Sequence, residues 1–344
     1  MTDQPKILVI QTAFIGDVIL ATPLFSALKQ HLPQARIECL TTPTAGDVLQ
    51  NNPHVDRLIT YDKHDSQKGL IGLLSLMRRL KKSEYNLVLA PHRSLRTALL
   101  VHCTGAPMRI GFDKNSGAWW YTHRCRYDAR QHETARNLSL LSALGIHADS
   151  QPPEIYPDAE NQWTVDRLTA PAQKNTRWVA LAPGSVWPTK RWPESRYREL
   201  AARLTADRCI VFLVGGKEDQ PLCRRIAEGL SPQVVDASGQ LSLRASAELL
   251  RRCRILVTND SAPMHLASAT GTLTLALFGP TVPAFGFGPY ARESVVLERS
   301  LECRPCTTHG SRRCPIKTHA CLTGITVSMV YDQLQQMINK GWTA

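Results

Sequence analysis

Short apolar runs alternate with longer stretches of helical periodicity along most of the first half of the chain. Strands are predicted where the apolar runs are short and rich in β-branched residues, at residues 7–10, 36–41, 58–61 and 86–90. Helical periodicity covers residues 18–31 and 68–82. Strands that alternate with helices in this way predict a parallel sheet with right-handed crossovers.

The alternation breaks between residues 146 and 177, where prolines lie among polar residues, and we interpret this stretch as a linker. The strands predicted beyond it are residues 178–182, 209–214, 255–258 and 272–278, and the helices are 194–206, 220–230, 243–252 and 327–340. A chain of 344 residues is also long for a single core. The pattern therefore predicts an α/β protein with two Rossmann-like, doubly wound domains facing each other across a cleft. Their predicted bounds are residues 1–165 and 175–326, and we expect a C-terminal helix at 327–344 to pack back on the N-terminal domain.

The charge of the chain favours anionic partners. Lys and Arg number 41 against 29 Asp and Glu, which gives a formal net charge of +12. Nucleic acid is disfavoured, because only 6% of the residues are aromatic and the sequence lacks helix-turn-helix, zinc-finger and RNA-binding signatures. The N-terminus does not resemble a secretion signal, and the longest apolar run, residues 69–77, is too short to span a bilayer. We therefore expect a cytoplasmic monomer that makes peripheral contact with an anionic membrane face.

The loop after the first strand ends in Gly16-Asp17 and lacks the G-x-G-x-x-G of a dinucleotide fold, which argues against a nicotinamide enzyme. Asp17 stands where the strand gives way to a helix. It either caps that helix or acts as a general base that takes a proton from an attacking hydroxyl. The sequence leaves both interpretations open.

A second loop, after the strand at 178–182, carries Ser185, Lys190 and Arg191 between tryptophans and prolines. One interpretation is a surface turn whose tryptophans pack on the domain. We favour the other, because a rigidly placed cation is what a departing diphosphate requires.

The strand at 255–258 leads to Asp260, and Ser261 opens the next helix. We expect the amides from Ser261 to Met264 to be unpaired and to hold a diphosphate, while Asp260 accepts hydrogen bonds from sugar hydroxyls. His265 shares a helix face with Ser261 and either contacts the ligand or has a structural role. Glu218, after the strand at 209–214, borders the nucleoside or belongs to an ordinary turn.

Four cysteines cluster near the C-terminus as Cys303-x2-Cys306-x7-Cys314-x6-Cys321. This spacing predicts either a closed structural zinc site or a set of reduced thiols that pack a proline-rich loop, and both interpretations stay open. We expect no cofactor to be required for catalysis. The chain lacks the G-x-S-x-G, G-x-x-x-x-G-K-[ST] and H-E-x-x-H motifs, which disfavours hydrolase, ATPase and metalloprotease functions.

Several segments in order along the chain resemble the bacterial heptosyltransferases, the inverting GT-B glycosyltransferases that build the inner core of lipopolysaccharide. The matching segments are residues 7–10, 14–18, 21–23, 183–185, 190–193, 257–267 and 277–281. The pattern is most similar to the type II enzymes. The resemblance implies a GT-B fold, with an N-terminal domain that binds the acceptor and a C-terminal domain that binds the ADP-sugar.

The resemblance also implies roles for individual residues. Asp17 would be the catalytic base, Lys190 a diphosphate ligand and Asp260 a contact to the donor hydroxyls. The other residues that it assigns to the ADP-heptose site are Ser185, Leu241, Ser261, Ala262 and His265, with Leu241 touching adenine. The implied acceptor is the lipid A-Kdo-heptose core at the cytoplasmic face of the inner membrane, which would receive its second heptose.

The sequence leaves three alternatives open. A type I enzyme would add the first heptose to Kdo-lipid A. A nucleotide-sugar epimerase of related fold would share the donor pocket but need no acceptor. A basic binding module, which is not an enzyme, would dock on anionic lipid or nucleic acid and show strong salt dependence.

Overall fold

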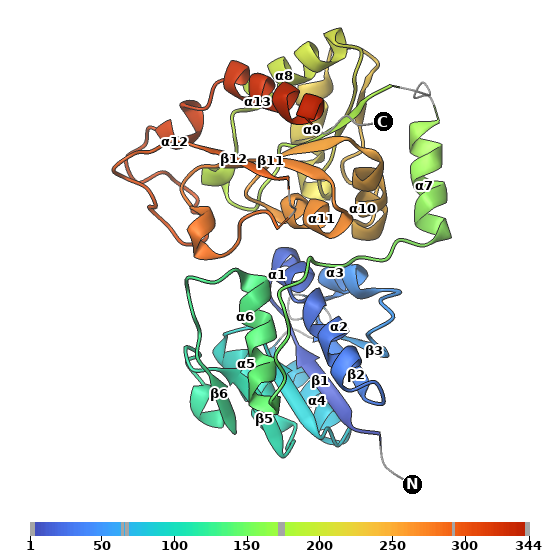
Figure 1. Ribbon diagram of the computed structural model, residues 1–344, viewed down its shortest axis with the longest axis vertical. Coiled ribbons are helices and arrows are strands. Elements are labelled where there is room, and N and C mark those ends of the chain that lie inside the picture. The colour runs from blue at the N-terminus through green and yellow to red at the C-terminus, as the bar shows by residue number, and fades with distance from the viewer. Residues whose placement is uncertain (1–3, 63–64, 66–68, 171–175, 291–292, 341–344) are drawn as a thin grey trace. The chain divides into compact units, whose positions relative to one another are not determined.

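The computed structural model describes residues 4–62, 65, 69–170, 176–290 and 293–340, and the chain divides into two compact units (Figure 1). The units are Met1–Tyr156 and Pro157–Ala344, so the boundary falls inside the predicted linker. Of the predicted elements, residue 68 of the first-half helix, residues 171–175 of the linker and residues 341–344 lie outside the described residues.

The N-terminal unit contains a parallel six-stranded sheet with the order β3-β2-β1-β4-β5-β6. Its strands are β1 (Lys6–Ile10), β2 (Arg36–Thr41), β3 (Arg57–Thr60), β4 (Leu87–Ala90), β5 (Met108–Phe112) and β6 (His123–Cys125). The helices are α1 (Ile15–Leu20), α2 (Thr22–His31), α3 (Pro43–Gly46), α4 (Gly69–Lys81), α5 (Leu95–Cys103) and α6 (Glu133–Ser139), with short 3₁₀ turns η1 (Asp47–Leu49), η2 (Ala118–Trp120) and η3 (Leu140–Leu144). The helix predicted at 18–31 begins earlier and is divided at Ala21, because Pro23 occupies the first turn of α2.

The second unit contains another parallel six-stranded sheet, with the order β12-β11-β10-β7-β8-β9. Its strands are β7 (Trp178–Ala182), β8 (Ile210–Leu213), β9 (Val234–Asp236), β10 (Ile255–Asn259), β11 (Leu273–Phe278) and β12 (Val295–Glu298). Its helices are α7 (Ala159–Thr169), α8 (Glu194–Ala206), α9 (Gln220–Ala227), α10 (Leu243–Arg252), α11 (Ala262–Thr270), α12 (Ala320–Thr323) and α13 (Val327–Lys340), with 3₁₀ turns η4 (Pro188–Lys190), η5 (Lys217–Asp219) and η6 (Pro283–Phe285).

The two sheets have the same topology. If the strands of each unit are counted from its first, both sheets read 3-2-1-4-5-6, which is a doubly wound arrangement of the kind predicted from the sequence. The strand order reverses between β1 and β4 in the first sheet and between β7 and β10 in the second. Open α/β sheets bind ligands beyond the carboxyl ends of the strands at this switch point. A candidate site is therefore expected after β1 and β4, and another after β7 and β10.

Helix α7 lies inside the predicted linker and belongs to the second unit, which therefore begins before residue 175. A capping box between Asp158 and Asn161 starts it. It is fastened to α10 by ion pairs, with Arg244 Nη1 2.6 Å from Asp158 Oδ2 and Arg252 Nη1 2.5 Å from Asp166 Oδ1. Because charged pairs hold this helix, with few buried apolar residues, the hydrophobic pattern did not predict it.

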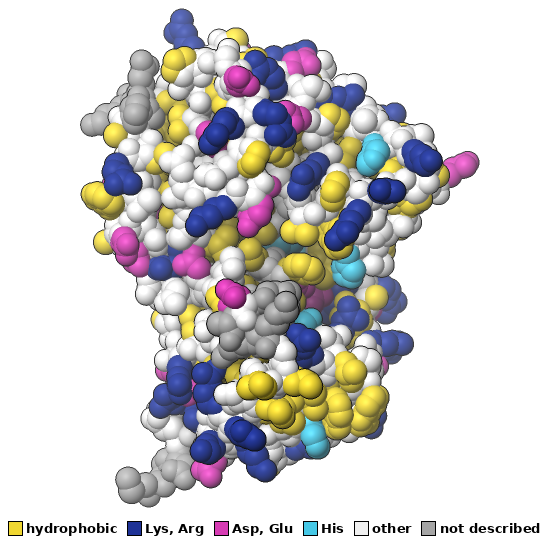
Figure 2. Space-filling model, turned by 180° about the vertical axis from the view of Figure 1, so that it is seen from behind, with side chains coloured by type: hydrophobic (Ala, Val, Ile, Leu, Met, Phe, Trp, Pro, Cys, Tyr) yellow, Lys and Arg dark blue, Asp and Glu magenta, His cyan; other side chains and the backbone are white. Residues whose placement is uncertain are grey.

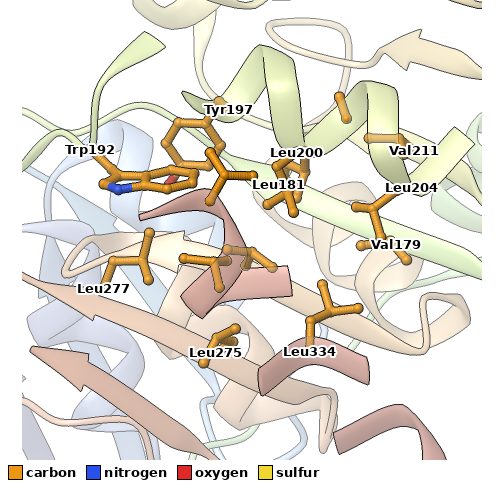
Figure 3. Packing of buried hydrophobic residues seen from close by; sticks show 14 of the residues in the cluster. Val179, Leu181, Trp192, Tyr197, Leu200, Leu204, Val211, Leu275, Leu277 and Leu334 are labelled. Carbon is orange, nitrogen blue, oxygen red and sulfur yellow. The ribbon is translucent and has the colours of Figure 1, made fainter. Parts of the chain in front are cut away.

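The C-terminal helix α13 completes the core of the second unit, whereas the sequence led us to expect that it packs on the N-terminal domain. Leu334 of α13 lies in the same buried cluster as Leu200 and Leu204 of α8 and Leu275 of β11 (Figure 3). The physical reason is that α13 and this face of the second sheet are both apolar, and packing them together removes both from water. The expected return to the N-terminal domain is therefore wrong for the apolar face of α13.

Candidate active site

Lys190 and Asp260 form a close ion pair beyond the carboxyl ends of β7 and β10. Lys190 Nζ lies 2.6 Å from Asp260 Oδ2, and the side chains are only 11% and 8% exposed. Lys190 ends η4, and Asp260 follows β10 directly. The structure thus brings together two residues that the sequence assigned to one site. Removing either residue would leave the other charge nearly buried and unpaired, which is energetically unfavourable. The two residues therefore depend on each other in this site.

Asn259, the last residue of β10, joins the two loops that carry this ion pair. Its Nδ2 donates to the carbonyl oxygens of Pro183 (2.9 Å) and Gly184 (3.3 Å). Its Oδ1 accepts from the Trp192 amide at 3.0 Å and from the Tyr197 hydroxyl at 3.2 Å. Asn259 is fully buried, so these bonds are shielded from water. Asn259 lies within a segment that carries the family resemblance, but the sequence did not indicate this role for it.

Hydrogen bonds within the loop after β7 also hold its conformation. Arg191 donates from Nε and Nη2 to the Ser185 carbonyl oxygen at 2.8 and 2.6 Å. Ser185 is 8% exposed, and its Oγ accepts a 3.3 Å bond from the Trp187 amide. Trp192 is buried and donates through Nε1 to the Ile325 carbonyl oxygen at 2.9 Å. Trp192 thus packs on the unit, as the turn interpretation required, and it anchors the loop that carries Lys190.

Asp260 has a second partner on the loop after β11. Thr281 Oγ1 donates to Asp260 Oδ2 at 2.6 Å. Arg304, which lies between Cys303 and Cys306, donates to the carbonyl oxygens of Gly279 and Thr281. The cysteine-rich loop therefore fixes the segment that orients the Asp260 carboxylate.

The first turn of α11 offers fewer unpaired amides than the sequence predicted. The Met264 amide donates to the Ser261 carbonyl oxygen at 3.0 Å, and Pro263 has no N–H. The expected row of free amides from Ser261 to Met264 is therefore wrong, and Ser261 and Ala262 are the residues whose amides an anion could meet. His265, which lies on α11, is only 5% exposed and is therefore a buried residue of the second unit.

The remaining predicted donor residues lie at the same edge of the second sheet. Glu218 is exposed on η5 after β8, and Leu241 is half-buried in the loop after β9. Sequence reasoning missed Asp219, which packs beneath the β7 loop: a Cβ on Gly184 would lie 2.2 Å from its Oδ1. Burial raises the pKa of Asp219, and its carboxylate accepts a 3.1 Å bond from the Gly216 amide. Asp219 therefore requires glycine at position 184.

In the N-terminal unit, Asp17 lies in the first turn of α1, after β1. Burial, followed by the negative charge of Glu133, raises the pKa of Asp17 to about 7. Hydrogen bonds from the backbone of Phe14 and Asp17 and the charge of Arg93 act in the opposite direction without cancelling this effect. Such a carboxylate is a stronger base than an ordinary helix-capping aspartate and ionises near neutral pH.

Glu133 begins α6, and it belongs to a buried network that the sequence did not reveal. Its Oε2 lies 2.8 Å from Arg136 Nη1, and the two residues are 5% and 1% exposed. Arg136 also donates to the Tyr127 hydroxyl at 2.6 Å, and the Arg93 guanidinium lies 3.7 Å from the centre of the Tyr127 ring. Within this network, Glu133 raises the pKa of Asp17 and Arg93 lowers it, and both act in addition to burial, which has the largest effect.

The loop after β4 brings His92 to the same switch point. His92 Nδ1 is 3.2 Å from Thr12 Oγ1 and 2.9 Å from Thr97 Oγ1. Thr12 follows β1, so this histidine connects the loops after the two central strands. Neither His92 nor Glu133 stands in a recognisable motif, and the available signal was the position of His92 directly after a predicted strand.

The four predicted metal-ligating cysteines, Cys303, Cys306, Cys314 and Cys321, line one cavity of about 30 Å³. Burial acts to raise the pKa of Cys314, but hydrogen bonds from the backbone of residues 316–319 outweigh it and lower that pKa. Within the described ranges, however, no group of three or more His, Cys, Asp or Glu side chains is arranged to hold a metal ion. As placed, the sulfur atoms share a cavity without forming a coordination shell, and the zinc site stays a prediction.

The sequence model of glycosyltransferase family 9 (heptosyltransferase) matches residues 73–317 of this chain. The chain belongs to glycosyltransferase family 9. It is similar to lipopolysaccharide heptosyltransferase 1 of Pseudomonas aeruginosa, at 28% identity over 319 residues that cover 88% of this chain and 86% of that protein. It is also similar to lipopolysaccharide heptosyltransferase 3 of Escherichia coli K12, at 29% identity over 288 residues that cover 78% of this chain and 81% of that protein.

The fold of this family 9 glycosyltransferase also matches a solved relative. The structure of E. coli ADP-heptose lipopolysaccharide heptosyltransferase II aligns with a TM-score of 0.80 at 23% identity, over 97% of this chain and 99% of that one. The predicted family, the α/β GT-B fold class and the assignment as a glycosyltransferase are confirmed. The family match includes Lys190 and Asp260 but begins after Asp17, so the role of Asp17 rests on its position and surroundings.

Proposed function

We propose that this enzyme is a lipopolysaccharide heptosyltransferase that moves L-glycero-D-manno-heptose from ADP-heptose to the inner core, with inversion at the anomeric carbon. Family membership and the names of the relatives support the class of reaction. The observation that carries the proposal is the Lys190–Asp260 pair beyond the central strands of the second sheet. It provides a cation for a diphosphate beside a carboxylate for sugar hydroxyls.

The strand order supports the direction in which the donor would lie. The neighbouring strands β9, β8, β7 and β10 are followed by Leu241, Glu218, Lys190 and Asp260, respectively. With neighbouring strands about 4.8 Å apart, these four loops span about 14 Å, which suits an extended ADP-sugar. Adenosine would lie near Leu241 and Glu218, the diphosphate at Lys190 and Ser261, and the heptose at Asp260.

In the proposed reaction, Asp17 takes the proton of the acceptor hydroxyl as that oxygen attacks the anomeric carbon of the heptose. The bond between this carbon and the β-phosphate oxygen breaks on the opposite face, and ADP leaves. Positive charge develops on the sugar and negative charge on the diphosphate, and Lys190 stabilises the latter. We propose that no metal takes part in the transfer. With the pKa of Asp17 raised to about 7, the base is strong enough for this late proton transfer.

We propose the lipid A-Kdo-heptose core as acceptor, at the cytoplasmic face of the inner membrane, which corresponds to a type II enzyme acting as a monomer. The sequence resemblance supports this step. Relatives named heptosyltransferase 1 and 3 are similar to the chain at nearly equal identity, so Kdo-lipid A is the alternative acceptor.

The proposal is tested by incubating the purified enzyme with ADP-heptose and core acceptors of defined length, with products weighed by mass spectrometry. We expect one heptose to be added to the heptose-bearing acceptor. Addition to Kdo-lipid A alone would make the enzyme type I. Conversion of ADP-heptose without any acceptor would identify an epimerase, and salt-sensitive lipid or nucleic-acid binding without ADP-heptose affinity would identify a binding module.

The same preparation tests the metal predictions. Chelation should leave transfer running if the chemistry needs no metal. Metal analysis of the wild-type enzyme and of a Cys303→Ser/Cys306→Ser variant decides whether the cysteines bind zinc. Equal, negligible zinc in both proteins would reject that site without affecting the proposed transfer.

A further inference from the structure

Helix α4 exposes apolar side chains on the face that does not pack on the core. Its inner face inserts Leu76 and Leu80 into the core of the N-terminal unit, as expected for an amphipathic helix. On the outer face, Leu70, Ile71 and Leu74 are 77%, 87% and 49% exposed. In the N-terminal half of this helix, Leu73 packs partly buried against the core, and the exposure of the three outer residues is not explained by burial against their own unit.

Two neighbouring elements extend this apolar surface. Leu95 at the start of α5 is 50% exposed, and Trp119 in η2 is 66% exposed. Helix α4 packs beside α5, and α5 packs beside η2. We call Leu70, Ile71, Leu74, Leu95 and Trp119 the apolar patch. Figure 2 shows hydrophobic side chains gathered on one face of the N-terminal unit, with Lys and Arg at its margin.

The charges of residues 69–82 are all positive, and the first acidic residue after them is Glu84. Arg78, Arg79, Lys81 and Lys82 are exposed, and residues 69–82 contain no Asp or Glu. A contiguous apolar surface next to unopposed cations matches an anionic lipid surface in two respects, since apolar side chains enter the acyl boundary while Lys and Arg meet the headgroups. Tryptophan also prefers this interfacial depth.

Single exposed apolar residues are common on soluble proteins and need no explanation. The patch differs, because three of its members lie on neighbouring turns of one helix and two more lie on adjoining elements. A protein partner would also cover apolar surface, but the run of cations without acidic residues favours a polyanionic surface. No helix among the described residues is long and apolar enough to cross a bilayer.

We propose that the apolar patch and the adjoining cations of α4 form a docking surface for anionic phospholipid bilayers. Leu70, Ile71 and Leu74 enter the headgroup and acyl boundary, Trp119 lies at the interface, and the cations of residues 78–82 bind lipid phosphates. This surface holds the N-terminal unit at a membrane whatever sugar the enzyme transfers. It also concentrates the enzyme where a lipid-linked acceptor is found.

Sedimentation with vesicles tests the proposal. The full-length enzyme should bind vesicles of phosphatidylcholine with phosphatidylglycerol and bind vesicles of phosphatidylcholine alone much less. A Leu70→Ser/Ile71→Ser/Leu74→Ser variant should lose about tenfold or more in partitioning, because each inserted side chain contributes through apolar burial. Trp163→Ser, which removes an exposed aromatic residue of α7, is the matched control and should bind like the wild type.

A second pair of variants separates local charge from total charge. Arg78→Gln/Arg79→Gln should weaken binding to the anionic vesicles by about 25-fold, since each cation near such a surface contributes about fivefold. Arg124→Gln/Arg126→Gln removes the same charge from exposed positions on and after β6 and should have little effect. Equal losses in both charge variants, or unchanged binding of the triple serine variant, would overturn the proposal.

Transfer to a water-soluble, delipidated core acceptor separates this inference from the proposed function. All of these variants should retain wild-type activity on that substrate, because none changes a residue of the candidate site. If the enzyme binds vesicles through α4 but does not transfer heptose, the docking surface stands and the proposed function fails. If it transfers heptose but does not bind anionic vesicles, the proposed function stands and the docking surface fails.

Discussion

The two units have the same strand order, yet opposite electrostatics at their switch points. In the N-terminal unit, Asp17 is partly buried near a second carboxylate, Glu133, and its pKa is raised to about 7. In the second unit, Asp260 lies 2.6 Å from the ammonium group of Lys190. Strand order therefore decides where a site forms, whereas residues from the surrounding loops and helices decide what it can do.

The two sites also differ in how they are supported. In the second unit, hydrogen bonds of Asn259 and Thr281 tie together the loops after β7, β10 and β11, which carry and orient the ion pair. The pKa of Asp17 depends instead on burial first, and then on the charges of Glu133 in α6 and Arg93 in the loop after β4. A fixed cation suits the binding of a leaving group, and a tuned carboxylate suits the movement of a proton.

The largest expected effect is a loss of heptose transfer with almost no change in ADP affinity, which would distinguish the roles of the two sites. Asp17→Asn should reduce heptose transfer by about 10³-fold or more, since it removes the general base while keeping the shape of the side chain. The affinity for ADP, measured by calorimetry, should stay within a few fold, because the base lies in the other unit. Transfer near the wild-type rate would remove Asp17 from the mechanism.

Lys190→Ala should affect binding and chemistry together. Loss of the cation should lower kcat by about 10²-fold and weaken ADP binding, because the same group meets the diphosphate before and during departure. Steady-state kinetics and ADP calorimetry measure the two effects. The control is Lys217→Ala, which removes an exposed lysine at the same edge of the sheet. If Lys190→Ala changed neither quantity, the ion pair would be only structural.

The raised pKa of Asp17 predicts a stability cost in the wild type that grows with pH. The folded state binds this proton more tightly than the unfolded chain, so stability falls as pH rises from about 4 through 7. Asp17→Asn should therefore increase the free energy of unfolding at pH 8, by at most about 4 kcal/mol, and change it little near pH 4. Urea unfolding at both pH values measures the difference, and a stabilisation independent of pH would contradict this account.

Asn259→Leu should loosen the second site without touching the first. The variant leaves buried carbonyl and amide groups unpaired, which should lower the free energy of unfolding of the second unit by about 1–3 kcal/mol. It should also raise the KM for ADP-heptose, because the β7 and β10 loops are no longer joined. Denaturant unfolding and donor titrations measure both effects. An unchanged KM despite lower stability would mean that the crosslink serves the fold alone.

The smallest predicted effect is a shift in the pH dependence of kcat when Glu133 is changed. Glu133→Gln removes a negative charge that raises the pKa of Asp17, so the acidic limb of the kcat profile should move down by up to about one pH unit. Arg93, whose charge lowers the pKa of Asp17, remains in this variant and continues to favour the ionised form. A merely structural role for Glu133 would lower activity at every pH without moving the limb.

Much of the fold could be predicted from the chain, because alternating short apolar runs and helical periodicities report local burial. The same pattern placed Asp17, Lys190 and Asp260 in the loops that follow predicted strands, which in a parallel sheet is enough to assign them to carboxyl edges. The pattern did not predict α7, which is held by ion pairs. It also placed α13 on the N-terminal unit, whereas the apolar face of this helix completes the core of the second unit.

The sequence by itself therefore determined two doubly wound units and the loops that carry the chemistry. Only the tertiary structure decided that Lys190 is paired with Asp260, that Asn259 joins their loops, that the first turn of α11 has few free amides, and that Glu133 acts on Asp17. The physical reason is range: periodicity and turn chemistry act over a few neighbouring residues, whereas desolvation and charge act through space between residues far apart in the chain.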